Sequence, residues 1–69
     1  MACSIPIYYL IDIVYADGTT GLRMEPDLAA ALAEAAEAEQ AGAWRAERIT
    51  LGRETVLVGD ALRREIGAA

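Results

Sequence analysis

Residues 5–16 (IPIYYLIDIVYA) constrain the fold most, because they predict one long β-strand that is apolar on both faces. Side chains alternate along a strand. One face therefore carries Ile5, Ile7, Tyr9, Ile11, Ile13 and Tyr15, and the other carries Tyr8, Leu10, Asp12, Val14 and Ala16. A strand of this kind is normally covered on both sides. We expect a helix to cover the isoleucine face, which leaves the second face in need of cover.

The turn and helix signals come next along the chain. Asp17-Gly18 predicts a hairpin turn that leads into a second strand at 19–24. Pro26 favours the start of a helix, and Gly42 is its natural end. The same kind of pattern predicts two further strands and a last helix, which Asp60 would cap: 43–51, 54–58 and 61–66.

These elements predict one domain, residues 1–69, of the α+β class. The expected architecture is an antiparallel four-stranded sheet with one Ala-rich helix packed on one face (ββαββ) and a short C-terminal helix. The helix face towards the sheet would carry Leu28, Ala31, Leu32, Ala35 and Ala38. Alanine buries little area, so large sheet residues must complete the core. The candidates are Ile7, Ile11, Ile13, Val56, Val58 and Trp44.

The second face of the first strand has two candidate covers. A second copy or a partner protein would bury it, since exposed apolar patches usually mark interaction sites. Alternatively, the last helix folds back over it with Leu62 and Ile66. The candidate self-association residues on this face are Tyr8, Leu10, Asp12 and Val14.

The third strand does not alternate cleanly. A bulge near Glu47-Arg48 would bring Trp44 and Ile49 onto one face, whereas a regular strand would turn Trp44 towards the second apolar patch. Trp and Arg are enriched at interface hot spots, so Trp44 and Arg45 are candidate partner-binding residues. The alternative role for Trp44 is a place in the core.

Two acids lie at positions where apolar residues are expected. Asp12 in mid-strand is either a buried acid with a perturbed pKa or, as we favour, a charge on the uncovered face. On that face it would be solvated or paired with an arginine of the adjacent strand, and it could also guard against aggregation. Glu39 lies on the core side of the helix, in its last turn. We expect it to extend past the sheet edge or to pair with Arg45 or Arg48.

Composition excludes several classes of function. The net charge is −5 with a pI near 4.4, which argues against direct nucleic-acid binding because phosphate contacts need clustered basic residues. Histidine is absent and Cys3 is the only cysteine, so the usual nucleophile–base pairs and zinc sites cannot be built. We therefore expect no enzyme, no cofactor and no metal. The lone cysteine and the lack of a signal-peptide pattern favour a reducing cytoplasm. The bias towards Arg and Ala is typical of a GC-rich bacterial or phage genome, so we expect the cytoplasm of a bacterial host cell.

Protein binding is the function that these exclusions leave. The acidic helix face, with the neighbouring Glu25 and Asp17, could imitate a phosphate backbone and occupy a basic groove. The candidate partner-binding residues of this face are Asp27, Glu34 and Glu37. One alternative is a homodimeric structural or adaptor protein. Another is an antitoxin-like partner of a small basic protein.

The stretch from VYADGTTG (residues 14–21) through the Ala/Glu helix to Ala41-Gly42-Ala43-Trp44 resembles the small phage-encoded anti-CRISPR proteins. The size, the acidity and the plan of a single helix on a sheet are similar as well. The resemblance implies stoichiometric inhibition of a bacterial CRISPR effector complex or nuclease, by blocking DNA access or recruitment. It assigns no role to an individual residue.

Overall fold

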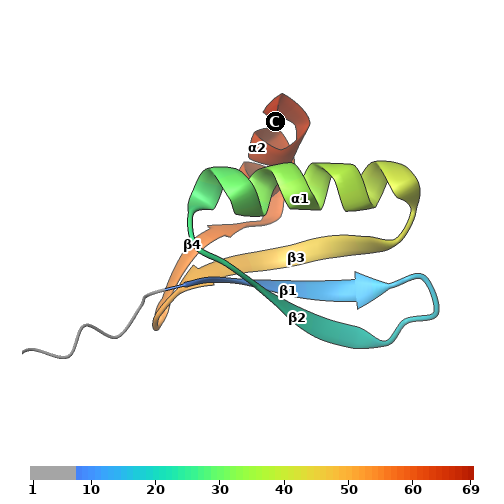
Figure 1. The fold of residues 1–69 in the computed structure, drawn as a ribbon, viewed down its shortest axis with the longest axis horizontal. Helices are drawn as coiled ribbons and strands as arrows, with labels where there is room; N and C mark the ends of the chain where they lie inside the picture. The colour runs from blue at the N-terminus through green and yellow to red at the C-terminus, as the bar shows by residue number, and fades with distance from the viewer. Residues whose placement is uncertain (1–7) are drawn as a thin grey trace, which may run out of the picture.

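A computed structural model describes residues 8–69 and shows four antiparallel strands and two helices (Figure 1). The elements are β1 (Tyr9–Tyr15), β2 (Thr20–Glu25), α1 (Leu28–Ala41), β3 (Trp44–Leu51), β4 (Glu54–Val58) and α2 (Gly59–Ala68). The strands form one sheet in the order β2-β1-β3-β4. The predicted α+β fold is confirmed, whereas Ile5 and Ile7 of the predicted first strand lie outside the described residues.

The hairpin turn and both ends of α1 form at or next to the residues that the sequence predicts. In the hairpin turn, Gly18 has a φ of 90°, and the Asp17 carboxylate accepts a 3.0 Å hydrogen bond from the Thr19 N–H. At the start of α1, the Asp27 side chain accepts a 2.7 Å bond from the Ala30 N–H. Gly42 ends the helix in the left-handed conformation, with a φ of 72°.

The start of α2 differs from the prediction. The helix begins at Gly59, directly after β4, and its N-cap is Val58, which has no side-chain hydrogen bond to offer. Asp60 lies in the first turn, where its charge complements the helix dipole. The prediction that Asp60 caps this helix is therefore wrong, because the glycine allows the chain to turn one residue earlier.

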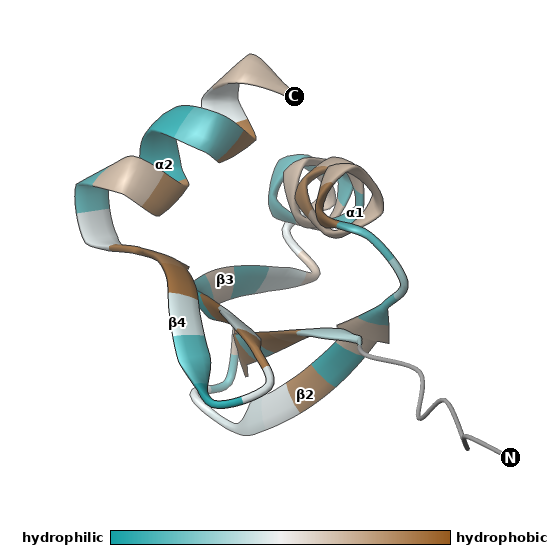
Figure 2. Ribbon diagram, turned by 90° about the vertical axis from the view of Figure 1, so that its left-hand side faces the viewer, coloured by the Kyte–Doolittle hydropathy of each residue, from teal (hydrophilic) through white to brown (hydrophobic). Residues whose placement is uncertain are grey.

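Both helices cover the same face of the sheet, and one core lies between them and the strands (Figures 1 and 2). The buried residues are Ile11, Ile13, Ala31, Ala35, Trp44, Ala46, Ile49, Leu62 and Ile66. Leu62 and Ile66 therefore fill the core beside α1, and the alternative that they shield the second face of β1 is wrong. The two buried residues of α1, Ala31 and Ala35, are small and leave room for this second helix.

A bulge in β3 decides which of its residues reach the core. Asp12 pairs with Arg48 and Ile13 pairs with Ala46, so Glu47 is an extra residue without an opposite partner in β1. The extra residue brings Trp44, Ala46 and Ile49 to the helix side. The predicted bulge is confirmed, and Trp44, with 9% of its surface exposed, belongs to the core.

A second irregularity lies between β3 and β4. Ile49 pairs with Leu57, but Thr50 pairs with Thr55, so Val56 is the extra residue here. Leu57 therefore packs against the core, while Val56 and Val58 remain exposed. The prediction that these two valines fill the core is wrong, because it assumed regular alternation of side chains along β4 and did not include this extra residue.

We expect opposite effects from the same substitution at two glycines. Gly42→Ala puts a side chain on a left-handed residue and should lower the free energy of unfolding by about 1 kcal/mol. Gly67→Ala, inside α2 and with no atom near the added methyl, should raise it by about 0.5 kcal/mol. Urea unfolding of both variants measures the difference, and equal signs would contradict the assigned helix ends.

Candidate protein-binding surfaces

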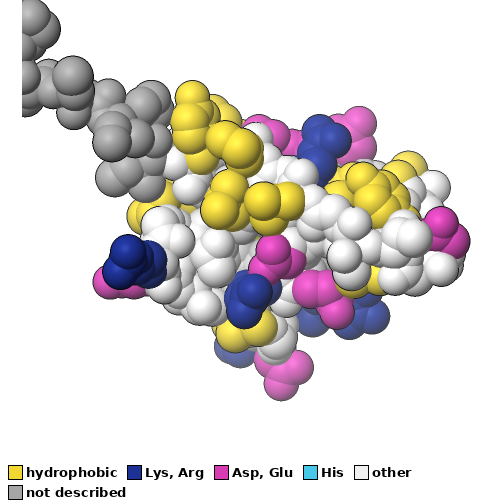
Figure 3. Space-filling view, turned by 90° about the horizontal axis from the view of Figure 1, so that it is seen from below, with side chains coloured by type: hydrophobic (Ala, Val, Ile, Leu, Met, Phe, Trp, Pro, Cys, Tyr) yellow, Lys and Arg dark blue, Asp and Glu magenta, His cyan; other side chains and the backbone are white. Residues whose placement is uncertain are grey.

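The sheet surface opposite the helices is one candidate surface, which we call the open face (Figure 3). Because Ile11 and Ile13 point to the helices, their neighbours in β1 point the other way, and directly paired residues share a face. The open face therefore consists of three rows that run across the strands. In the order β2, β1, β3 and β4 they are Leu22, Asp12, Arg48 and Val58; Met24, Leu10, Thr50 and Thr55; and Thr20, Val14 and Arg45.

Apolar side chains lie on both margins of the open face. Leu22 and Met24 on β2 are 55% and 56% exposed, and Val58 on β4 is 53% exposed. Leu10 and Val14 between them are half-buried, and Tyr8 is exposed just before β1. No helix or strand formed by residues 8–69 lies over these side chains. The predicted self-association residues thus share one solvent-facing surface.

Ion pairs occupy the middle of the open face. Asp12 Oδ2 lies 2.8 Å from the Arg48 guanidinium, with 38% and 53% of the two side chains exposed. The predicted cross-strand pairing of Asp12 is confirmed. Arg45 and Glu47 approach at 3.5 Å at one side of this pair. Next to the pair, Val14, Thr20 and Val58 border a shallow hollow of about 480 Å³.

The open face carries no net charge. Its ion pairs contribute two carboxylates and two guanidinium groups. The net charge of −5 therefore resides entirely on the other surfaces of the molecule. An apolar, neutral sheet face and an acidic remainder are the two surfaces from which a binding function can be built.

The predicted acids of α1 lie on the acidic remainder, but they are not equivalent. Asp27 is engaged as the N-cap, and Glu34 forms an ion pair with Arg23 of β2. Glu37 is exposed and takes part in no ion pair within residues 8–69. Among the three acids, Glu37 is therefore the most available to a partner.

Glu25, at the end of β2, enlarges this acidic group. A hydrogen bond from the protonated Glu25 carboxyl group to the Glu34 carboxylate raises the pKa of Glu25, and burial and the negative charge of Glu34 act in the same direction. When two carboxyl groups are in contact, one of them keeps its proton to a higher pH than an isolated carboxyl group does. The sequence predicts that Glu25 neighbours the acidic helix face, but not that its carboxyl group contacts Glu34.

Trp44 and Arg45 differ in how far their side chains are exposed. The Trp44 side chain is part of the core, while Arg45 lies across from Val14 on the open face. Adjacent residues of a strand point to opposite faces, and these two side chains come near each other only at the groove that both of them border. Only Arg45 is accessible, and it belongs with the self-association residues rather than with the acidic ones.

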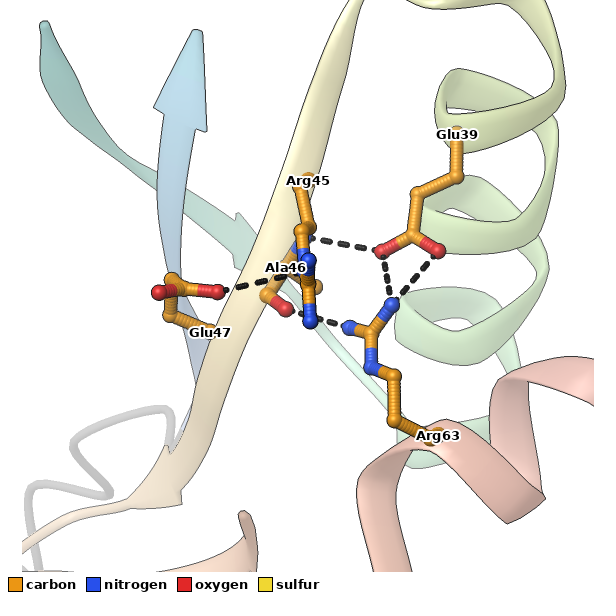
Figure 4. A network of polar contacts seen from close by, with 5 residues as sticks. All are labelled: Glu39, Arg45, Ala46, Glu47 and Arg63. Atoms are coloured by element: carbon orange, nitrogen blue, oxygen red, sulfur yellow. Dashed lines mark hydrogen bonds and ion pairs between the residues drawn. The ribbon is translucent and has the colours of Figure 1, made fainter. Parts of the chain in front are cut away.

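Glu39 takes part in a polar clamp that joins three elements (Figure 4). Its carboxylate accepts hydrogen bonds from the Ala46 N–H at 3.0 Å and from Arg63 of α2 at 2.8 Å, and Arg63 also donates to the Ala46 carbonyl. The last residue of β4 pairs with Arg48, so β4 does not reach Ala46, and these side chains bind the Ala46 backbone on that side of β3. The predicted partners of Glu39, Arg45 and Arg48, are wrong, because Glu39 points to α2.

A wide groove of about 770 Å³ lies beside this clamp and is bordered by Tyr15, Trp44 and Arg63. Its charged side chains are paired with one another, Glu39 with Arg63 and Arg45 with Glu47. Within residues 8–69, no group of three acidic, histidine or cysteine side chains could hold a metal ion. In the same range, no helix has the length and apolarity to cross a membrane.

Comparison of the chain with protein-family models, curated proteins and solved structures gives no significant match in any of the three. The roles of the two surfaces are therefore argued from their own geometry and charge.

We expect the clamp to stabilise the fold. Arg63→Met removes the guanidinium and leaves the Glu39 carboxylate and the Ala46 carbonyl without their donor, which should lower the free energy of unfolding by about 2 kcal/mol. Arg64→Met, at the exposed neighbour on the same helix, should change it by less than about 0.5 kcal/mol. Equal losses in urea unfolding would show that the clamp contributes nothing of its own.

The raised pKa of Glu25 predicts a pH-dependent stability. An acid whose pKa is raised by folding favours the folded state while protonated, and this contribution is lost as the pH rises through the folded pKa. Glu25→Gln removes the repulsion from Glu34 and should give a higher melting temperature than wild type at pH 7. The two proteins should converge below the usual glutamate pKa. Glu54→Gln serves as the control, and a pH-independent gain for Glu25→Gln would argue against this contact.

Proposed function

We propose that this chain is a small acidic protein-binding module, of the anti-defence inhibitor type found in phages and mobile elements. On this proposal it docks on a nucleic-acid-binding bacterial complex, such as a CRISPR effector or nuclease, and blocks it stoichiometrically. The observation that carries the proposal is the segregation of charge. The open face is neutral, and the whole net charge of −5 lies on the helix layer and the sheet margins.

An acidic surface of this kind fits the basic groove of a nucleic-acid-binding protein. Such grooves present Lys and Arg side chains to phosphates, and a negative surface competes for the same side chains. The carboxylates of α1 stand on a helix that is capped at both ends and anchored in the core by Ala31 and Ala35. Their positions are fixed before binding, so little conformational entropy is lost on docking.

Glu37 is the carboxylate on which this proposal depends most. Glu34 already shares its charge with Arg23, and the charge of Asp27 is offset by the start of the helix it caps. Glu37 lies on the same helix, is exposed and keeps its full charge for a partner. Charge reversal there changes the docking surface without breaking an ion pair of residues 8–69.

Inhibition should therefore depend on Glu37. Wild-type protein, expressed in a bacterium with CRISPR immunity, should restore plating of the targeted phage. Glu37→Arg should reduce the restored plating at least about tenfold, since tenfold corresponds to 1.4 kcal/mol of binding free energy. The readout is the efficiency of plating, with purified effector and labelled DNA as the biochemical counterpart.

Glu54→Arg is the matched control, because it makes the same change of charge at an exposed residue at the start of β4. It should inhibit like wild type. Equal activity of the two variants would exclude docking through α1. Failure of the wild-type protein to restore plating on any CRISPR-immune host would exclude the CRISPR inhibitor role and leave the homodimeric adaptor and the antitoxin-like partner as candidates.

A further inference from the structure

We propose that the open face is the interface of a symmetric homodimer, in which two copies of the chain stack their sheets face to face. This surface is distinct from the acidic one, so the proposal stands or falls independently of the inhibitor role. It rests on the order of residues in the rows that cross the open face, and on the symmetry that this order permits.

The central row is self-complementary. It reads Leu22, Asp12, Arg48 and Val58 from β2 to β4, that is apolar, acidic, basic and apolar. All four side chains are directly paired neighbours across the sheet, so they lie at one level along the strands. When the row of a second copy is laid against it in the reverse order, each acidic group faces a basic group and each apolar group faces an apolar group. The row can therefore bind a second copy of itself.

One symmetry operation uses this complementarity. A two-fold axis that lies between the sheets and runs parallel to the strands keeps the level and reverses the strand order. It places Asp12 opposite Arg48 of the second copy, and Leu22 opposite its Val58. An axis that runs across the strands through this row would instead set Asp12 against Asp12 and Arg48 against Arg48. The charges therefore select the first operation.

The second row is compatible with this arrangement, and the third row sets Val14 opposite Arg45 of the second copy, whose aliphatic stem can pack on the valine. Met24 and Leu10 meet the threonine pair Thr50 and Thr55 of the second copy, whose methyl groups and hydroxyls suit a partly apolar contact. Stacked sheets pack about 10 Å apart with their strands within about 30° of each other. The exposed Leu22, Met24 and Val58 would lose their contact with water, which is the main driving force for association.

A second copy fits this face better than a foreign partner does. The face is neutral, so it offers no net attraction to a basic or an acidic protein. Two copies that meet there keep their acidic surfaces on the outside, where the repulsion between two chains of charge −5 is weakest. The homodimer would then present two identical acidic surfaces in opposite directions.

Charge exchange between two variants tests the proposal. Asp12→Arg and Arg48→Asp each place like charges opposite one another, within the chain and across the interface, and each variant alone should be monomeric. Mixed in equal amounts, one chain carries two guanidinium groups and the other two carboxylates, and every contact across the interface is again complementary. The mixture should therefore dimerise. Light scattering should give twice the 7.4 kDa chain mass for wild type and the mixture, and the single mass for each variant.

Leu22→Glu and Val58→Arg provide a second pair at exposed positions where the fold tolerates substitution. Each variant alone sets a charge against an apolar side chain, and only the mixture sets the introduced charges against each other. Glu54→Arg and Arg64→Asp repeat the charge changes outside the open face and should remain dimeric. Circular dichroism confirms that all the variants are folded.

Three results would overturn the proposal. Wild-type protein of 7.4 kDa at every concentration would leave the face to another partner. Dimeric Asp12→Arg and Leu22→Glu variants would place the interface elsewhere, for example at the free edge of β2. Monomeric variants that fail to assemble when mixed, in both pairs, would exclude the two-fold arrangement.

Discussion

The pairing of β1 with β3, and the extra residue that it contains, is the constraint on which the other features depend. At Glu47 the alternation of side chains along β3 shifts by one residue. Because of this shift, Trp44 and Ala46 point to the helices and Arg45 points to the opposite side. Without the bulge, the core would lose its only tryptophan and gain an arginine. Arg48 pairs with Asp12 on the near side of the bulge, so one irregularity supplies both the core and the ion pairs of the open face.

The alanine-rich surface of α1 has a complementary effect. Ala31 and Ala35 are fully buried, yet they fill little space, so the helix lies close to the sheet and leaves part of it uncovered. Leu62 and Ile66 of α2 occupy that part. Two small helices therefore share one side of the sheet, and no element within residues 8–69 remains for the other side. The open face follows from how the core is filled.

Local signals made most of the secondary structure predictable. Asp17-Gly18, Asp27 and Gly42 each act through bonds to neighbours within a few residues, so their effect can be inferred from the sequence. The β3 bulge and the Asp12–Arg48 pair were also predictable, because an interrupted alternation and a charge in mid-strand each allow few solutions. Contacts between distant elements were not. Two of these contacts depend on the path of β4: the ion pair of Glu39 with Arg63, and the side of the sheet on which α2 packs. The path of β4 includes the extra residue Val56, which no pattern in the sequence indicates.

The clamp formed by Glu39, Ala46 and Arg63 also has a consequence for the order in which the chain becomes structured during synthesis. Arg63, Leu62 and Ile66 all belong to the last element, yet they complete contacts begun by α1 and β3. A nascent chain that has reached only β4 lacks two core side chains and leaves the Ala46 carbonyl without its donor. The hairpin and α1 can form locally, but cooperative packing has to wait until α2 leaves the ribosome. An interruption of synthesis before α2 therefore leaves the helix side of the sheet covered by α1 alone, with the space of Leu62 and Ile66 unfilled.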